Sequence, residues 1–261
     1  MTRPANHEAY LIPGLARGLA ALEIIAQRGE IRGAELAAEL GIGRSSAHRI
    51  LYTLRDAGFL REGGTRGAYV PTARVLSLGF AWLARQPLAT RAAPHLAALR
   101  DRAGVSAHLS VLDGTDALYL ASEGARSAYV SNIVPGHRVP AHVGANGWVL
   151  LGGLDDAAFD AFCAECDFVP RTEHTPTDAD ALRRRIAHAR TTGHVLSRGF
   201  ADPAGASLSV PVRGPGGTVP ACVSLSGPMS GFDFDRVDDL YLPATRAAAE
   251  AVAAELGHTV T

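Results

Sequence analysis

Lysine is absent from this chain: all 25 of its Lys and Arg residues are arginine. That absence excludes Schiff-base enzymes, nucleotide hydrolases with a Walker A lysine, and hydrolases with a Ser–Lys pair. Cysteine is scarce, and three residues cannot form a framework of paired disulfides, so a reducing cytoplasm is expected. The longest apolar runs fall far short of a membrane span and no secretory signal is recognised, so no membrane association is expected.

The charge is divided unevenly along the 261 residues, a length that suggests two domains. Residues 1–86 contain 11 arginines and seven acidic residues, whereas residues 87–261 contain 14 arginines and 19 acidic residues. The front part is therefore basic and the rest acidic, although the net charge is only −1. Such a division is typical of a DNA-binding head on a body that does not bind DNA.

The stretch from Ala34 to Leu60 has the pattern of a helix-turn-helix. Helices predicted over Ala34–Leu40 and Arg44–Ala57 are separated by a turn with two glycines, which tolerate positive φ. The second helix has an apolar face and a polar, cationic face that suits the major groove of DNA. The predicted DNA contacts on that face are Arg44, Ser45, Ser46, His48, Arg49 and Tyr52. An ordinary helical hairpin with a solvated outer face is the alternative.

Short strands over 59–61 and 68–70 flank a Gly-rich turn and predict a β-hairpin wing. Together with an amphipathic helix over Pro13–Arg28, they predict a winged helix-turn-helix domain over residues 10–71. Arg66 at the tip of the wing is placed for a phosphate or for the minor groove of DNA. A solvated turn is the alternative for this residue.

A mostly apolar helix over Thr72–Gln86 predicts a linker helix, residues 72–88, between two domains. Its apolar excess, which includes Trp82, predicts a contact with the same helix of a second subunit. Packing of this helix against its own domain is the alternative. The partner expected at this helix is therefore another copy of the chain.

The remaining residues, 89–258, alternate short strands with helices in the pattern of an α+β domain, an antiparallel sheet flanked by helices. Strands are expected over 108–112, 117–122, 128–134, 139–143, 207–212 and 221–226. Helices are expected over 90–102, 144–154, 155–166, 177–190 and 235–256. Asn146 is a favourable N-cap residue near the start of the second of these helices.

Several short motifs follow one another along the front of the chain. They are Pro13-Gly14-Leu15, Glu35-Leu36-Ala37-Ala38-Glu39-Leu40-Gly41, Ser46-Ala47-His48-Arg49-Ile50-Leu51-Tyr52-Thr53-Leu54, Ala57-Gly58-Phe59 and Tyr69-Val70-Pro71-Thr72-Ala73-Arg74-Val75-Leu76-Ser77-Leu78-Gly79. Their order resembles the IclR family of bacterial transcriptional regulators, and the resemblance extends from about Pro13 to Gly257. It implies a winged helix-turn-helix, a linker helix and a C-terminal effector-binding domain related to GAF and PAS sensors. It also implies three partners, which are double-stranded operator DNA, a small-molecule effector and further copies of the chain in a dimer or tetramer, and no cofactor.

The resemblance further implies where the effector binds. A segment like Gly136–His142 leads into a loop of small residues and a helix start, and serines on two later strands form the opposite wall. The effector contacts expected on this basis are Val139, Ala141, His142, Gly144, Ala145, Asn146, Asp202, Ser207, Ser224 and Ser226. The alternative is that several of these side chains face away from the pocket.

Three segments depart from the family pattern. Gly147-Trp148-Val149 stands where Gly-Lys-Ala is common, Val105 stands where Glu is usual, and Ser197–Asp202 replaces an acidic pair. The expected effector is a small organic or aromatic acid. Trp148 and Phe200 favour a larger or aromatic ligand, and a core position for Trp148 is the alternative.

Two further motifs could carry other chemistry. Cys163 and Cys166 form a C-x-x-C motif with His174 nearby, but a tetrahedral zinc site needs four ligands, and only Cys222 remains. A hydrolase could combine pocket serines with His142 and Asp202, yet no Gly-x-Ser-x-Gly motif occurs. The run Arg183–Arg185 is interpreted as a solvated helix face. Neither an enzyme nor a metal site is expected, and a small-molecule-binding protein with hydrolase-like or metal chemistry is the alternative function.

Overall fold

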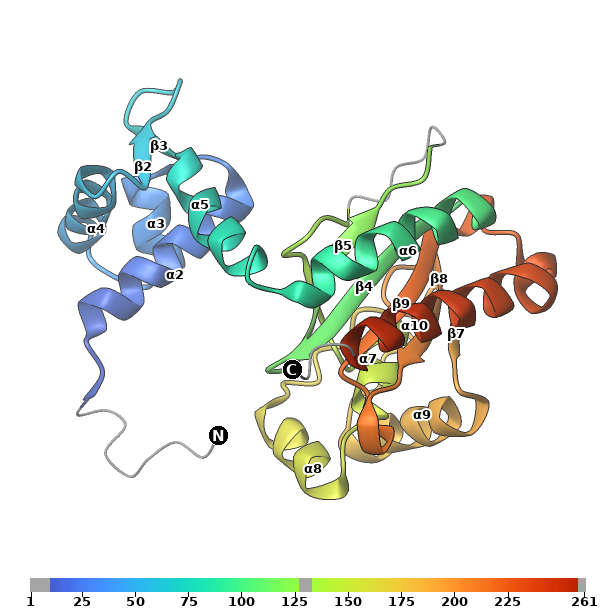
Figure 1. Ribbon diagram of the computed structural model, residues 1–261. Coiled ribbons are helices and arrows are strands. Elements are labelled where there is room, and N and C mark those ends of the chain that lie inside the picture. Colours follow the sequence, from blue (N-terminus) through green and yellow to red (C-terminus); the bar gives the residue numbers. More distant parts are fainter. Residues whose placement is uncertain (1–9, 127–132, 258–261) are drawn as a thin grey trace. The chain divides into compact units, whose positions relative to one another are not determined.

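The computed structural model describes residues 10–126 and 133–257 (Figure 1). This part of the chain forms two compact units, which divide between Arg85 and Gln86. None of its helices is long and apolar enough to cross a membrane. The strand predicted over 128–134 falls mostly on residues outside the described part.

The first unit combines helices with a small antiparallel sheet in which β3 lies between β1 and β2. Its elements are α2 (Pro13–Arg28), β1 (Ile31–Arg32), α3 (Gly33–Glu39), α4 (Arg44–Asp56), β2 (Leu60–Glu62), β3 (Ala68–Pro71) and α5 (Ala73–Leu83). The helix-turn-helix is confirmed as α3 and α4, and β2 and β3 form the wing. Its core consists of Ala21, Ile25, Ile31, Leu36, Ala37, Ala47, Leu51 and Leu60.

The turn between α3 and α4 depends on Gly41, whose φ is +61°. Residues with a Cβ rarely adopt this left-handed conformation, so glycine suits the position. The amide of Ile42 donates to the carbonyl of Ala37 at 3.0 Å and so continues the end of α3. The half-buried Ile42 side chain packs against the core. These contacts fix the angle at which α4 leaves the turn.

Helix α5 is anchored to the first unit at its start and exposed along its length. The Thr72 hydroxyl donates to the carbonyl of Gly58 at 2.6 Å and accepts from the amide of Arg74 at 3.2 Å, which makes Thr72 the N-cap. The Arg74 guanidinium lies 5.2 Å from the centre of the Phe59 ring. No α5 side chain is buried in the single chain. Its large exposed apolar side chains are Leu76, Leu78, Phe80 and Trp82.

In the described part of the second unit, six strands form one antiparallel sheet in the order β6-β5-β4-β9-β8-β7. The strands are β4 (Ser106–Asp113), β5 (Asp116–Glu123), β6 (Arg138–Pro140), β7 (Val195–Arg198), β8 (Gly205–Val212) and β9 (Ala221–Pro228). The helices are α6 (Pro87–Ala103), α7 (Ala145–Leu151), α8 (Asp156–Glu165), α9 (Ala179–Thr192) and α10 (Leu242–Gly257). The predicted α+β architecture, an antiparallel sheet flanked by helices, is confirmed.

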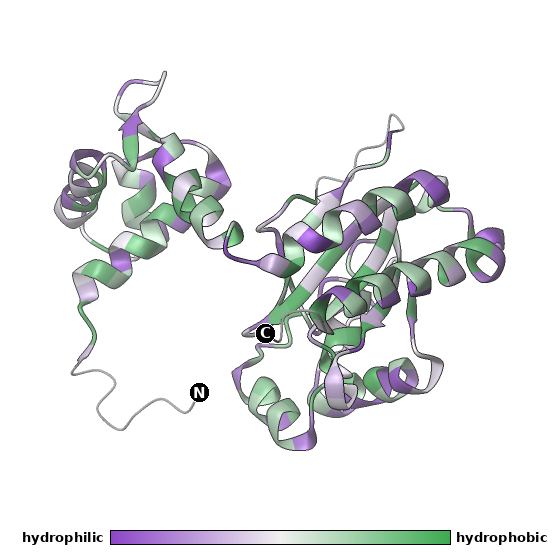
Figure 2. Ribbon diagram, viewed as in Figure 1, coloured by the Kyte–Doolittle hydropathy of each residue, from purple (hydrophilic) through white to green (hydrophobic). Residues whose placement is uncertain are grey.

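The sheet is covered on both faces. Helices α6 and α10 contact each other and run across one face, whereas α7 contacts five strands from the other face and packs against α9 (Figure 1). Leu109, Leu208 and Leu225 alternate with polar residues along their strands and are fully buried. Figure 2 shows the resulting change between hydrophobic and hydrophilic segments along these strands. The two faces of the sheet therefore differ in chemistry.

Several predicted boundaries are wrong for identifiable reasons. Helix α6 begins at Pro87 instead of Thr90, because a proline in the first helical turn needs no N–H partner. Gly144, and not Asn146, is the N-cap of α7. The predicted helix over 235–256 begins as a 3₁₀ turn and a π turn, and α10 follows from Leu242. Strand β7, only four residues long, was not predicted.

Candidate functional site

Helix α4 presents its polar side chains to solvent and its apolar side chains to the core. Ala47 and Leu51, one helical turn apart, are buried, and α4 contacts α2 and α3. Every side chain predicted to contact DNA is exposed: Arg44, Ser45, Ser46, His48, Arg49 and Tyr52 on α4, and Arg66 on the wing. Tyr52 is 53% exposed, a large fraction for an aromatic residue. The α4 face is thus available to a ligand, which the prediction requires.

Three arginines of this surface have no partner for their charge among the described residues. Within residues 10–126 and 133–257, the guanidinium groups of Arg44, Arg49 and Arg66 form no hydrogen bond or ion pair. Arg55 on the same helix differs, because it pairs with Glu62 at 3.0 Å and lies 5.2 Å from the Tyr52 ring centre. Unpaired guanidinium groups on an exposed helix can bind phosphate oxygens or guanine edges.

The wing is held to the end of α2. Within the hairpin, the amide of Gly63 donates to the carbonyl of Ala68 at 2.8 Å, and the amide of Ala68 donates to Thr65 at 3.0 Å. The amide of Thr65 also donates to the Glu30 carboxylate at 3.3 Å. A Cβ at Gly63 would lie 2.7 Å from that carboxylate, so a larger residue there would require the Glu30 side chain to move. These contacts position Arg66 at the tip of the hairpin.

One face of the sheet in the second unit, here called the polar face, is lined by hydrogen-bonding side chains. The register pairs His108 with both Ser122 and Ser224, and pairs Ser207 with Ser226, so these side chains point to one side. The polar face consists of Ser106, His108, Ser110, Ser122, Ser197, Ser207, Ser209, Cys222, Ser224 and Ser226. Helix α7 covers this face, whereas the helices α6 and α10 lie on the apolar one.

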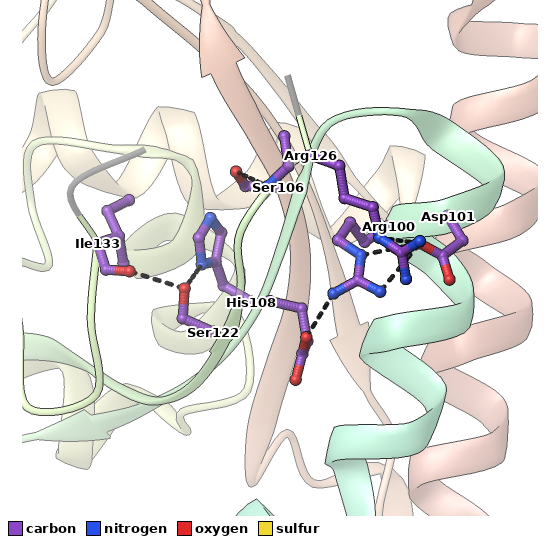
Figure 3. Close-up of polar contacts among 9 residues, drawn as sticks. Arg100, Asp101, Ser106, His108, Ser122, Arg126 and Ile133 are labelled. Atoms are coloured by element: carbon purple, nitrogen blue, oxygen red, sulfur yellow. Dashed lines mark hydrogen bonds and ion pairs between the residues drawn. The ribbon is translucent and has the colours of Figure 1, made fainter. Parts of the chain in front are cut away.

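His108 is the centre of a hydrogen-bonded chain on the polar face. Its side chain is fully buried, with Nε2 at 2.8 Å from the Ser226 hydroxyl and Nδ1 at 2.9 Å from the Ser122 hydroxyl. The Ser122 hydroxyl donates to the carbonyl of Ile133 at 2.7 Å (Figure 3). Burial, together with nearby His137, lowers the pKa of His108 from 6.5 to about 4. The imidazole is therefore neutral at pH 7.

This chain of bonds determines the tautomer of His108. Ser122 has one hydroxyl hydrogen, which it gives to Ile133, so it must accept from Nδ1–H of His108. Nε2 then has no proton and accepts the hydroxyl hydrogen of Ser226. Ser226, which is only half-buried, is left with lone pairs to offer a ligand. At this position the polar face accepts hydrogen bonds rather than donating them.

Asn146 joins α7 to the polar face. Its amide nitrogen donates to the Ser110 hydroxyl at 3.1 Å, and its amide oxygen accepts from the Ser209 hydroxyl. The Cys222 thiol lies 3.1 Å from the same Ser110 hydroxyl, and burial raises the pKa of this thiol to about 12. Asn146 was expected at a helix start and as an effector contact. In the structure its side chain bonds strand residues instead of capping α7.

The start of α7 is packed tightly on its surroundings. A Cβ at Gly147 would lie 1.9 Å from the carbonyl oxygen of Ala141, so only glycine fits there. A Cβ at Gly144 would lie 3.3 Å from the Ala201 side chain, which places Gly144 and Ala145 beside the loop before β8. That loop also contains Asp202. The structure therefore brings the start of α7 and the Asp202 loop together.

The other expected effector contacts divide into separate groups. Ser207 and Ser226 are half-buried cross-strand partners on the polar face, and Ser224 beside them is buried. Asp202 is exposed, and its carboxylate accepts from the amide of Ala204 at 2.9 Å, as in a tight turn. Val139 pairs with Ala117 at the opposite edge of the sheet, and Ala141, buried in the core, follows β6.

His142 is separated from the serines by its own contacts. Its Nε2 lies 3.1 Å from the carbonyl of Val169, its Nδ1 lies 3.5 Å from the Cys166 sulfur, and its ring contacts Phe168. Burial lowers the pKa of His142. A hydrolase dyad of His142 with Asp202 would need a contact, and in the described residues neither side chain bonds the other.

The C-x-x-C motif lies at the end of α8. Burial raises the pKa of the thiols of Cys163 and Cys166, which favours protonated rather than metal-binding sulfur. Over residues 10–126 and 133–257, no group of three or more His, Cys, Asp or Glu side chains is placed to hold a metal ion.

Sequence reasoning missed His108, Ser110, Ser122 and Ser209, which form the best-connected part of the polar face. A signal was present, because Ser106, His108 and Ser110 alternate with apolar residues along one strand. Ser226, the partner of His108, lies more than one hundred residues further along the chain, and Ser209, the partner of Asn146, lies several elements after it. Only the strand order brings these residues close together.

Comparison with known proteins agrees with this architecture. The family model of the IclR helix-turn-helix domain matches residues 14–64, and that of the bacterial transcriptional regulator IclR C-terminal domain matches residues 80–254. The Pca regulon regulatory protein of Pseudomonas putida is 29% identical over 240 residues, covering 90% of this chain and 80% of the relative.

Two solved structures are similar over almost the whole chain. A protein from Rhodococcus sp. RHA1 has a TM-score of 0.79 at 29% identity, covering 96% of this chain and 100% of the other. An IclR homolog from Microbacterium hydrocarbonoxydans, complexed with 4-hydroxybenzoate, has a TM-score of 0.74 at 25% identity, covering 94% and 100%. Since both family models match and together span most of its length, this chain belongs to the IclR family and is a DNA-binding transcriptional regulator with an effector-binding C-terminal domain.

Proposed function

We propose that the exposed face of α4 and the tip of the wing contact operator DNA. On α4 the contacts are Arg44, Ser45, Ser46, His48, Arg49 and Tyr52, and on the wing the contact is Arg66. The supporting observation is that three guanidinium groups of this surface form no bond with other described residues. In a dimer, paired recognition helices read two half-sites one or more helical turns apart.

The test is binding to the DNA upstream of the regulator's own gene, against scrambled DNA, over a range of salt. Arg49→Ala is expected to weaken operator binding by about 1–3 kcal/mol if it reads a base. If Arg49 instead contacts a phosphate, the salt slope falls by about one. Arg17→Ala, an exposed arginine of α2, is the control with the same charge change. Equal losses in both variants would count against the α4 surface.

The effector site, in this proposal, lies where the half-buried serines of the polar face meet the start of α7 and the Asp202 loop. Its contacts are Gly144, Ala145, Asn146, Asp202, Ser207, Ser224 and Ser226. Val139, Ala141 and His142 support the site from outside, since Val139 pairs with Ala117 in the sheet, Ala141 is buried in the core, and His142 bonds the carbonyl of Val169. Buried side-chain polar atoms in the described part all have partners, so a ligand binds at the rim or exchanges existing bonds.

A small aromatic hydroxy acid fits this chemistry. The acceptor lone pairs of Ser226 suit a ligand hydroxyl, and the donors of Ser207 and Asn146 suit a carboxylate. A homolog binds 4-hydroxybenzoate, and a relative is named for the Pca regulon. Wild-type protein is therefore expected to bind 4-hydroxybenzoate about tenfold more tightly than benzoate, the worth of one hydrogen bond.

Calorimetry with both acids measures this preference, and Ser226→Ala is expected to abolish it. Asp202→Ala and Ser207→Ala are expected to reduce the effect of the acid on DNA binding and leave DNA affinity itself unchanged. Binding of neither acid, with operator binding intact, would refute the effector class and leave the regulator assignment standing.

The exposed apolar side chains of α5 pair with those of a second subunit, giving a dimer or tetramer. Effector binding shifts the population between DNA-competent and DNA-incompetent assemblies. The protein works in the cytoplasm, and it binds its effector without turning it over.

A further inference from the structure

A groove beside α9 has a cavity volume of about 540 Å³, within the range typical of small-molecule sites. It lies between α9, the segment before α9, the start of β7 and the Trp148–Phe200 pair. None of the ten expected effector contacts lines it, although Trp148 and Phe200, which the sequence links to a larger or aromatic ligand, do. The groove is therefore a separate feature of the effector domain.

One face of α9 supplies cations to this groove. Ala181, Arg184, Arg185 and His188 recur at intervals of three or four residues, and all four line the groove. His174 and His194 line it from neighbouring segments. Among the lining residues, Glu173 alone has a carboxylate side chain.

The two arginines have unused hydrogen-bonding capacity. Within the part of the chain that the structure describes, the guanidinium groups of Arg184 and Arg185 form no hydrogen bond or ion pair. Their neighbour Arg183 points elsewhere, to Asp160 at 2.9 Å and Asp156 at 3.5 Å on α8. All three arginines are exposed, as the solvated-face interpretation expects, but among the described residues only Arg183 of the three has carboxylate partners.

An aromatic floor orients Arg185. Its guanidinium carbon lies 5.2 Å from the Trp148 ring centre and 5.6 Å from that of Phe200, and the two rings lie 5.0 Å apart. The ring of His174 contacts Phe200 from the other side, at 5.5 Å. A guanidinium stacked on aromatic rings keeps its N–H edge available for bidentate bonds to an anion.

From the groove, the unpaired guanidinium groups and the aromatic floor, we propose that the Arg184–Arg185 groove binds a small organic anion with two or more negative charges. Phosphate esters and polycarboxylates share this chemistry. The site is distinct from the effector site, because Asn146 and Trp148 point to opposite sides of α7. Residues two apart on a helix do not face each other, and Asn146 bonds the polar face while Trp148 lines the groove.

Trp148 provides a direct reporter of this site. The chain has two tryptophans, so Trp82→Phe leaves Trp148, under Arg185, as the source of tryptophan emission. The full-length Trp82→Phe protein is titrated with pyrophosphate and with citrate at constant ionic strength, with sodium chloride as the comparison. Saturable quenching or enhancement by pyrophosphate or citrate, and not by chloride, is the expected result. Calorimetry with the wild-type chain checks the stoichiometry of one anion per subunit.

Neighbouring arginines supply matched variants. Arg184→Gln and Arg185→Gln are each expected to weaken the binding about tenfold or more, because each removes a charge-assisted hydrogen bond. Arg183→Gln makes the same charge change on the same helix outside the groove and is expected to leave the affinity within twofold. A preference for pyrophosphate over citrate would identify phosphate esters as the ligand class, and the reverse would identify polycarboxylates.

Three results would overturn the proposal. Neither anion binds more tightly than chloride, or Arg183→Gln weakens binding as much as Arg184→Gln does, or duplex DNA of unrelated sequence displaces the anion. The assay uses neither operator nor aromatic acid, so its outcome is independent of the proposed function.

Discussion

Replacing His108 by glutamine is expected to remove a pH dependence from the stability of the effector domain. The pKa of His108 is about 4 in the folded protein and 6.5 in an unfolded chain. Below pH 6.5 the unfolded chain therefore binds a proton that the buried imidazole does not. Stability from this group is complete above pH 6.5 and is lost as the pH falls toward 4. Between pH 7.5 and 5.0 the loss amounts to about 2 kcal/mol.

Urea unfolding at pH 7.5, 6.5, 5.5 and 5.0 measures this loss, with Trp148 emission followed in a Trp82→Phe background. The free energy of unfolding of the His108 protein should fall by about 2 kcal/mol more than that of His108→Gln over this range. Comparing slopes cancels the constant cost of the substitution and the titration of other groups. Parallel pH profiles for the two proteins would refute the reasoning, because they would mean that His108 titrates alike in both states.

Three further substitutions, the first with a matched control, test packing, capping and assembly. Gly147→Ala should lower the free energy of unfolding by about 3 kcal/mol or more, because the added Cβ would meet the backbone of Ala141. Gly18→Ala in α2, where the added Cβ meets open space, should raise it by about 0.5–1 kcal/mol. Similar effects of the two substitutions in urea unfolding would contradict the tight packing at Gly147. Thr72→Ala should cost about 1–2 kcal/mol in the stability of the first unit through the lost cap of α5, and no change in its thermal midpoint would argue against that role. Phe80→Asp on the exposed face of α5 should lower the mass found by analytical ultracentrifugation, and an unchanged assembly would exclude α5 as the contact.

The helices of the first unit could be predicted closely because their signals are local. Pro13 and Gly29 bound α2, and the glycines around Ile42 mark the turn before α4. Periodicity alone then separates the buried from the exposed face of α4. For the same reason, the candidate DNA contacts could be read directly from the spacing of polar residues.

The polar face could not be assembled in this way. Asn146 is a residue type favoured at N-caps, yet its hydrogen bonds to Ser110 and Ser209, on distant strands, decide its position. The partner of His108 is Ser226, and their contact depends on β4 lying beside β9, a pairing over 118 residues. Local patterns give the face of a strand, but the neighbour of a strand depends on the whole topology.

The close contact between Gly147 and Ala141 is one of several that join the start of α7 to neighbouring segments. The Trp148 indole donates to the carbonyl of His142 at 2.8 Å, and the amide of Ala141 donates to the carbonyl of Thr115 at 2.9 Å. The start of α7, the end of β6 and the β4–β5 turn are therefore parts of one body. A ligand on the polar face or in the groove would therefore contact a helix whose start is connected, through Ala141 and His142, to the β4–β5 turn.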